Sequence, residues 1–334
     1  MRKLRLGLYP YAYARVSVMK GELLSPVQWQ GLLKMGPHEA LRYLQDTTYK
    51  QEIDELPESH ELLAIEIALN RNLFRTLAKL KRIADEKLRG VLETYVQRYD
   101  TENFKTLLRG ALSGIPREEV APLLIPSINY SSAYYEHLLS LDADKLVAAL
   151  PGGLSSGLPK THDLFALENA LDRWYANGLS ALAERLAGQG SLLKQFLRAE
   201  QDILNIKIIL RLRREQPAAG IRAFLIEPSP RITAFLNAKG TRELIDALHK
   251  SGFTTLTGDE AAAEEDLLTQ LEIDLDAALL RKESHLMHQH PLTVNVILGF
   301  LFAKEIEVRN LKVLLKGKQL GLAEPLLHRL LVAA

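Results

Sequence analysis

Residues 61–83 read ELLAIEIALNRNLFRTLAKLKRI. Apolar residues recur in this stretch at spacings of three and four, which places them on one face of an α-helix. The stripe consists of Leu62, Ile65, Leu69, Leu73, Leu77 and Leu80. The same spacing recurs along the chain, alternating strand-like runs are missing, and the prolines gather between the apolar stripes. The sequence therefore predicts an all-α fold.

Three phrases in the chain repeat one another: DTENFKTLLRG, QDILNIKIILR and EIEVRNLKVLLKG. Each phrase contains an asparagine, and an acidic residue precedes it by three positions. The asparagines are Asn103, Asn205 and Asn310, and the acids are Asp100, Asp202 and Glu307. Such spacing through the chain is typical of internal repeats.

A second motif recurs upstream of each phrase, as EIALNR, ENALDR and EIDLDA. Its glutamates are Glu66, Glu168 and Glu272, and its second polar residues are Asn70, Asp172 and Asp276. The second polar residue precedes the phrase asparagine by 33, 33 and 34 positions, and the third copy has Ala277 in place of arginine. An amphipathic helix end (LRYLQDTTY, LVAALPGGL or LIDALHKSGF) also recurs in each unit. Proline clusters separate the units, so we expect helical repeats at 1–115, 116–220 and 221–334.

The asparagine and acid of each phrase lie on or beside an apolar stripe. A buried amide without a partner costs about 1–3 kcal/mol, so these side chains are expected to tie one helix to its neighbours. The alternative is a ligand site built from aspartate, asparagine and lysine, but catalysis rarely needs three similar sites spread evenly over one chain. The basic residues after each asparagine are expected to face solvent. They are Lys105, Lys207 and Lys312, followed by Arg109, Arg211 and Lys316.

Composition excludes several classes of function. The chain has 334 residues, 42 basic and 41 acidic, so it lacks the basic excess typical of nucleic-acid-binding proteins. It has no cysteine, which excludes thiol catalysis and cysteine-ligated metal. The most apolar stretch, 295–304, is about half the roughly 20 residues that span a bilayer. The N-terminal MRKLRLGLYPYAYA superficially resembles a signal peptide, but Pro10 interrupts its short apolar run, so we interpret it as part of the folded protein.

Two stretches imitate chemical sites. PGGLSSGLPKT at 151–161 has the two glycines of a phosphate-binding loop, but Leu158 and Pro159 separate them from the Lys-Thr pair, and no strand is predicted before it. We expect a loop there. HLMHQHP at 285–291 has three histidines near metal-binding spacing, but its third precedes Pro291, where a helix is expected to end. The sequence therefore predicts no catalytic residues, no cofactor site and no metal site.

Several of these stretches resemble one protein family. YAYARVSVMKGELLS at 11–25, the EIALNR and ENALDR motifs with their phrases, and above all HPLTVNVILGFLFAKEIEVRNLKVLLKGKQLGL at 290–322 are similar to the C-type subunit of the bacterial and archaeal V/A-type ATPases. Its eukaryotic relative is the d-type subunit of the V-ATPase. The resemblance covers essentially the whole chain.

The resemblance implies a funnel-shaped, all-helical, non-catalytic subunit with pseudo-three-fold symmetry, lying on the cytoplasmic side of the membrane. Its expected partners are the central shaft subunits, of D and F type, and the membrane rotor ring, so that ATP synthesis or hydrolysis is coupled to proton or sodium transport. Nucleic acid and cofactors are not expected. Two alternatives remain at this stage: a generic helical-repeat scaffold for another complex, and a nucleotide- or metal-dependent enzyme that uses one of the two imitating stretches.

Overall fold

The computed structural model describes residues 4–5, 7–56, 62–187, 191–213, 217–226, 228–238, 240–250, 275 and 292–331. In these ranges the regular elements are helices, apart from two strands of two residues each, β1 (Leu4–Arg5) and β2 (Leu186–Ala187), which pair in parallel. The prediction of an all-α fold is confirmed. Within the same ranges, no helix is both long and apolar enough to cross a bilayer.

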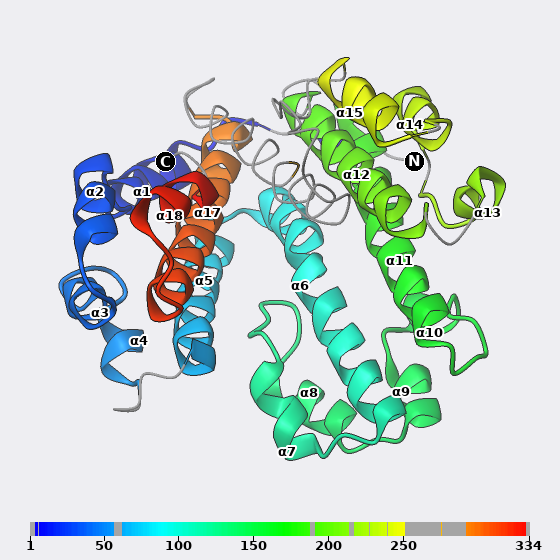
Figure 1. Cartoon of the computed structure of the whole chain (residues 1–334), viewed down its shortest axis with the longest axis horizontal. Coiled ribbons are helices and arrows are strands. Elements are labelled where there is room, and N and C mark those ends of the chain that lie inside the picture. The colour runs from blue at the N-terminus through cyan, green and yellow to red at the C-terminus, as the bar shows by residue number, and fades with distance from the viewer. Residues whose placement is uncertain are drawn as a thin grey trace.

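Long helices form the centre of the molecule (Figure 1). They are α5 (Leu62–Ile83), α6 (Glu86–Ser113), α11 (Leu164–Arg185), α12 (Ser191–Leu212) and α17 (Val294–Gln319). Helix α5 packs along α17, and α11 packs along both α6 and α12. The predicted apolar stripe is the buried face of α5, with Ile65, Leu69 and Leu77 each at most 1% exposed. The phrases lie in α6, α12 and α17, so each belongs to a long helix.

Short helices gather in groups around the long ones (Figure 1). One group packs on α17 and α5, a second on α6, and a third on α12. The first group is α1 (Pro10–Gly21), α2 (Pro26–Lys34), α3 (Pro37–Leu44) and α4 (Lys50–Asp54), joined by α18 (Glu324–Leu330). The second is α7 (Arg117–Val120), the 3₁₀ turn η1 (Ala121–Leu123), α8 (Ser132–Leu139), α9 (Ala143–Ala149) and α10 (Gly152–Ser155), and the third is α13 (Ala218–Arg222), α14 (Pro230–Leu236) and α15 (Thr241–Lys250).

The described residues form three hydrophobic clusters that match these groups. The largest joins the first group to α5, α17 and the first half of α6. A second lies around Phe104 and Leu108 of α6 and the helices that follow it, and a third lies around Ile206 of α12. Burying a leucine or phenylalanine side chain stabilises the fold by about 1.5–3 kcal/mol, so each group is held mainly by the apolar face of one long helix.

Two glycines allow the chain after a phrase to pack closely against its own helix. A Cβ on Gly110 of α6 would lie 2.6 Å from a methyl carbon of Val120, and a Cβ on Gly317 of α17 would clash with Leu327. Both glycines follow the phrase asparagine by seven positions. A larger residue at either position would force the side chain of Val120 or Leu327 to shift, which explains the preference for glycine there.

The stretch 151–161 differs from the expected loop in one respect. Residues 152–155 form the one-turn helix α10, and this turn buries the side chain of Leu154 in the second cluster. The element before it is the helix α9 and not a strand, so the setting of a phosphate-binding loop is missing. The histidine stretch 285–291 lies outside the described residues.

Candidate functional site

The phrase asparagines of α6 and α12 hold the chain that follows. Asn103 donates from Nδ2 to the carbonyl of Ile125 at 2.7 Å, and its Oδ1 accepts from the amide of Ile125 at 2.8 Å. Asn205 makes the same two bonds to Ile226, at 2.8 and 2.7 Å. Each asparagine is at most 1% exposed, as is Asn310 of α17. Each buried amide thus pairs with both the N–H and the C=O of one residue in a loop within the following group of short helices.

The phrase acids bind the same loops. Asp100 accepts from Ser127 Oγ at 2.5 Å, from Asn129 Nδ2 at 2.7 Å and from the Tyr135 hydroxyl at 2.9 Å. Burial raises the pKa of Asp100, and these three donors oppose the rise because they favour the charged carboxylate. Burial likewise raises the pKa of Asp202, and the interactions with Ser229 and Arg231 oppose this rise.

The acid of the third phrase binds the beginning of the chain. Glu307 Oε2 accepts from the amide of Leu24 at 2.6 Å, and Oε1 accepts from the Tyr49 hydroxyl at 2.7 Å. Lys304 Nζ lies 2.9 Å from Oε1, in a site where all three side chains are buried. Helix α17 therefore holds the segment from α1 to α4, which precedes it by more than 200 residues.

The basic residues of the first phrase face the neighbouring helix. Lys105 Nζ lies 2.6 Å from Asp172 and 2.9 Å from Glu102, and Arg109 Nε lies 2.5 Å from Glu168. The expectation that these side chains face solvent is wrong for Lys105, which is only 8% exposed. Residues four apart share a helix face, so Lys105 and Arg109 of α6 meet Asp172 and Glu168 of the antiparallel α11.

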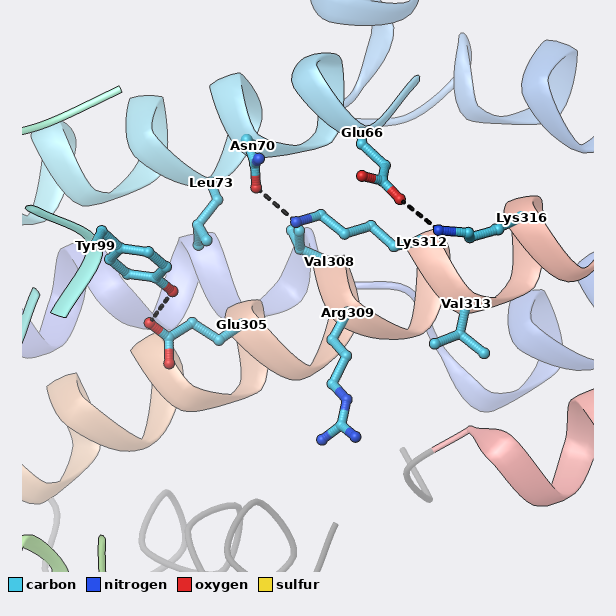
Figure 2. Close-up of a pocket in the computed structure, with 10 residues that line it drawn as sticks. All are labelled: Glu66, Asn70, Leu73, Tyr99, Glu305, Val308, Arg309, Lys312, Val313 and Lys316. Carbon is cyan, nitrogen blue, oxygen red and sulfur yellow. Dashed lines mark hydrogen bonds and ion pairs between the residues drawn. The ribbon is translucent and has the colours of Figure 1, made fainter. Parts of the chain in front are cut away.

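The third phrase repeats this arrangement against α5. Lys312 Nζ donates to Asn70 Oδ1 at 2.7 Å, and Lys316 Nζ lies 3.5 Å from Glu66 (Figure 2). Four residues of the upstream motif thus bind the basic residues of a phrase: Glu66, Asn70, Glu168 and Asp172. Their counterparts Glu272 and Asp276 lie outside the described residues.

A buried ion cluster joins α6, α12 and α17. Arg98 Nη1 lies 3.3 Å from Glu200 Oε1, and Arg98 Nη2 pairs with Glu305 Oε2. The hydroxyls of Tyr95 and Tyr99 donate to Glu305 at 2.9 and 2.7 Å. Both glutamates are 7% exposed. One guanidinium therefore balances two carboxylates from two other helices.

Electrostatics in the cluster follow from this unequal balance. Burial alone would lower the pKa of Arg98, but Glu305, the tyrosines and Glu200 together raise it well above its usual value. Burial raises the pKa of Glu200, Arg98 lowers it, and Glu305 raises it further. One oxygen of Glu200, Oε2, is buried and has no hydrogen-bond partner among the described residues.

Sequence reasoning missed this cluster, although a signal was present. Arg98, Glu200 and Glu305 each precede a phrase asparagine by five positions. Their common offset from the phrase asparagine is the signal, but a shared offset is hard to notice when one of the three residues is basic and the other two are acidic.

A cavity of about 330 Å³ lies beside the cluster, between α5 and α17. Its lining includes Leu73, Tyr99 and Val308 together with Lys312 and Arg309 (Figure 2). The described residues contain no group of three histidines or acids that could hold a metal ion. The arrangement combines helices joined by polar contacts with a partly basic cavity between α5 and α17.

Comparison with known proteins gives the family. The sequence model of the ATP synthase (C/AC39) subunit family matches residues 12–329. The C-type subunit of the A-type ATP synthase of Methanococcoides burtonii is 30% identical, over 97% of this chain and 94% of the relative. The same subunit of Methanosarcina mazei is 31% identical, over 97% and 92%, and that of Halobacterium salinarum 29% identical, over 95% of both chains. The chain therefore belongs to the ATP synthase (C/AC39) subunit family.

Proposed function

We propose that this chain is the non-catalytic central-stalk subunit of a V/A-type rotary ATPase, peripheral on the cytoplasmic face of the membrane. In this role it holds the shaft subunits, of D and F type, at one end and the membrane rotor ring at the other. The three bodies then turn together, and ATP synthesis or hydrolysis is coupled to proton or sodium transport. The names of the relatives, each the C-type subunit of an A-type ATP synthase, support this assignment.

The observation that carries the proposal is the pairing of α17 with α5. It repeats the pairing of α6 with α11 between residues at matching offsets, and it joins the end of the chain to its beginning. We infer from it three units that close on themselves around a pseudo-three-fold axis, in the order first, second, third and first again. The ion cluster of Arg98, Glu200 and Glu305 lies on that axis.

The proposed closed order of the three units predicts specific ion pairs for the basic residues of the second phrase. At the matching offsets, Lys207 and Arg211 of α12 are expected to pair with Asp276 and Glu272. Charge reversal at Lys207 (Lys207→Asp) should destabilise the protein, and combination with Asp276→Lys should restore most of the loss. Equal destabilisation in the single and double variants would contradict the three-fold order.

A closed ring suits a subunit that transmits torque. Interiors of helical bundles are packed at nearly the density of organic crystals, so a ring of three such units resists deformation. The long helices are also tied by buried ion pairs, whose loss leaves an uncompensated charge. We propose a funnel shape for this ring, with the shaft entering the funnel and the rotor ring docking on the opposite face.

The test is recovery of the tagged chain from its own cells in mild detergent, with partners identified by mass. We expect the shaft subunits and a small, very apolar ring protein. Arg98→Glu, which places a third acid in the cluster, should lose these partners. The control Arg117→Glu should retain them, because Arg117 is exposed and, among the described residues, its ion pair is with the neighbouring Glu118. Recovery of unrelated soluble proteins, without a rotor component at any salt concentration, would favour a helical scaffold of another complex.

A further inference from the structure

The cavity between α5 and α17 has an apolar wall and a basic side. Leu73 comes from α5, and Val308 and Val313 come from α17 (Figure 2). Three of its lining residues are cations, Arg309, Lys312 and Lys316. Its volume of about 330 Å³ lies at the lower end of the range for small-molecule sites.

Within the part of the chain that the structure describes, the cavity is lined by fewer carboxylates than cations. Glu305 also lines it, but Glu305 and Glu200 share the single cation Arg98. Among the described residues, the three lining cations and Arg98 therefore outnumber these two acids and Glu66 by four to three. Glu66 is the remaining acid, and it lies 3.5 Å from Lys316. Lys312 is bonded to the neutral amide oxygen of Asn70, and Arg309 extends from α17 away from α5, with no hydrogen bond or ion pair to the described residues (Figure 2).

The matching position at the other interface shows which group is missing. Lys105 of α6 has the carboxylate of Asp172 at 2.6 Å, and Asp172 corresponds to Asn70. The change from carboxylate to amide removes one negative charge opposite a largely buried ammonium. Burial lowers the pKa of Lys312, and Glu66 only partly opposes this, whereas the pKa of Lys105 is raised. An anion beside Lys312 would stabilise the charged form of this largely buried ammonium.

We propose that this cavity binds a carboxylate group with a short apolar body, which supplies the charge that Asn70 lacks. The carboxylate accepts a hydrogen bond from Lys312, while Arg309 and Lys316 stand at the rim. Leu73, Val308 and Val313 cover the apolar part of the ligand. The same chemistry is available from a free organic acid or from a glutamate side chain of a partner protein. This site does not depend on the proposed coupling role.

The first arm of the test titrates the full chain with sodium pentanoate and follows binding by calorimetry and by the Cε–Hε NMR signal of Lys312. We expect saturable binding and a shift of that signal, and no binding of 1-pentanol, which has the same apolar body without the charge. The second arm uses the capped peptide acetyl-Leu-Glu-Leu-amide. Stronger binding of the peptide than of pentanoate assigns the site to a partner's side chain, and the reverse order assigns it to a free acid.

Asn70→Asp is the decisive variant. It places a carboxylate beside Lys312 with almost no change in the shape of residue 70. This carboxylate competes with the ligand for Lys312, so pentanoate binding should weaken at least tenfold while the protein stays folded. Asp172→Asn, the mirror change at the interface between α6 and α11, should leave pentanoate affinity unchanged. Lys312→Met should also abolish binding, and it serves if Asn70→Asp proves unstable. The proposal is overturned if neither probe binds, or if pentanoate binds the wild type and the folded variants at position 70 or 312 with equal affinity.

Discussion

The interface between α6 and α11 and the interface between α17 and α5 use matching positions with different charges. In the first, Lys105 and Arg109 meet Asp172 and Glu168 at 2.6 and 2.5 Å. In the second, Lys312 and Lys316 meet Asn70 and Glu66 at 2.7 and 3.5 Å. The second interface has one carboxylate fewer and a cavity beside it.

This difference shows how the side chains at matching positions set the electrostatics of a helix contact. Burial acts to lower the pKa of both lysines. At Lys105, Asp172 and Glu102 outweigh burial and raise the pKa, whereas at Lys312 burial prevails. Residues at matching positions meet in both helix pairs, whereas the charges at those positions differ.

The largest effect is expected at the cluster that both interfaces border. Arg98→Met leaves two buried glutamates without a cation, which should lower the free energy of unfolding by about 3–5 kcal/mol. Urea denaturation followed by circular dichroism would measure it. Adding Glu200→Gln and Glu305→Gln to Arg98→Met should recover part of the loss, since no charge is then left unpaired. A loss below about 1 kcal/mol for Arg98→Met would mean that the cluster does not join the helices.

A smaller loss of stability is expected when the interface between α6 and α11 is made to resemble the interface between α17 and α5. Asp172→Asn removes the closest carboxylate from Lys105, while Glu102 remains 2.9 Å away. The free energy of unfolding should fall by about 1–2 kcal/mol. The matched control is Asp142→Asn, whose exposed pair with Lys145 should contribute almost nothing. Equal effects of the two substitutions would contradict the comparison.

The opposite substitution should stabilise the second interface. Asn70→Asp gives Lys312 a carboxylate at the position of its present hydrogen bond, and we expect a gain of about 0.5–1 kcal/mol. The gain should disappear in a Lys312→Met background, because the introduced charge then has no partner. A double-mutant cycle of these substitutions measures the coupling, and a coupling of zero would count against the pairing.

The smallest effect is a difference in pH dependence between about pH 8 and about pH 10. The pKa of Lys312 is lowered on folding, so above this lowered pKa the unfolded chain binds more protons, and the contribution of Lys312 to stability rises with pH up to about 10.4. The pKa of Lys105 is raised, so its contribution is fully present below about 10.4 and falls only as the pH rises through the raised value. Melting temperatures of Lys312→Met and Lys105→Met, each compared with the wild type across this range, should therefore differ in slope. Identical slopes would contradict the assigned directions.

Much of the fold follows from spacing alone. The stripe in 61–83 predicts α5, because a period near 3.6 has one structural solution, and the apolar residues it aligns are those that the core buries. The phrases likewise predict α6, α12 and α17. The orientation of Lys105 could not be predicted in this way, because a charged residue beside an apolar stripe is directed outward or inward according to the partner that another helix supplies.

By itself, the sequence determined the helical class, the positions of the phrases and the family, since these depend on local period and on ordered motifs. Only the tertiary structure decided which residues meet. Arg98, Glu200 and Glu305 are about a hundred positions apart in the chain, and Glu307 binds Leu24 near the other end. Such contacts depend on how the helices surround one another. An ammonium or carboxylate buried there is stable only where a distant helix provides the opposite charge or a hydrogen bond.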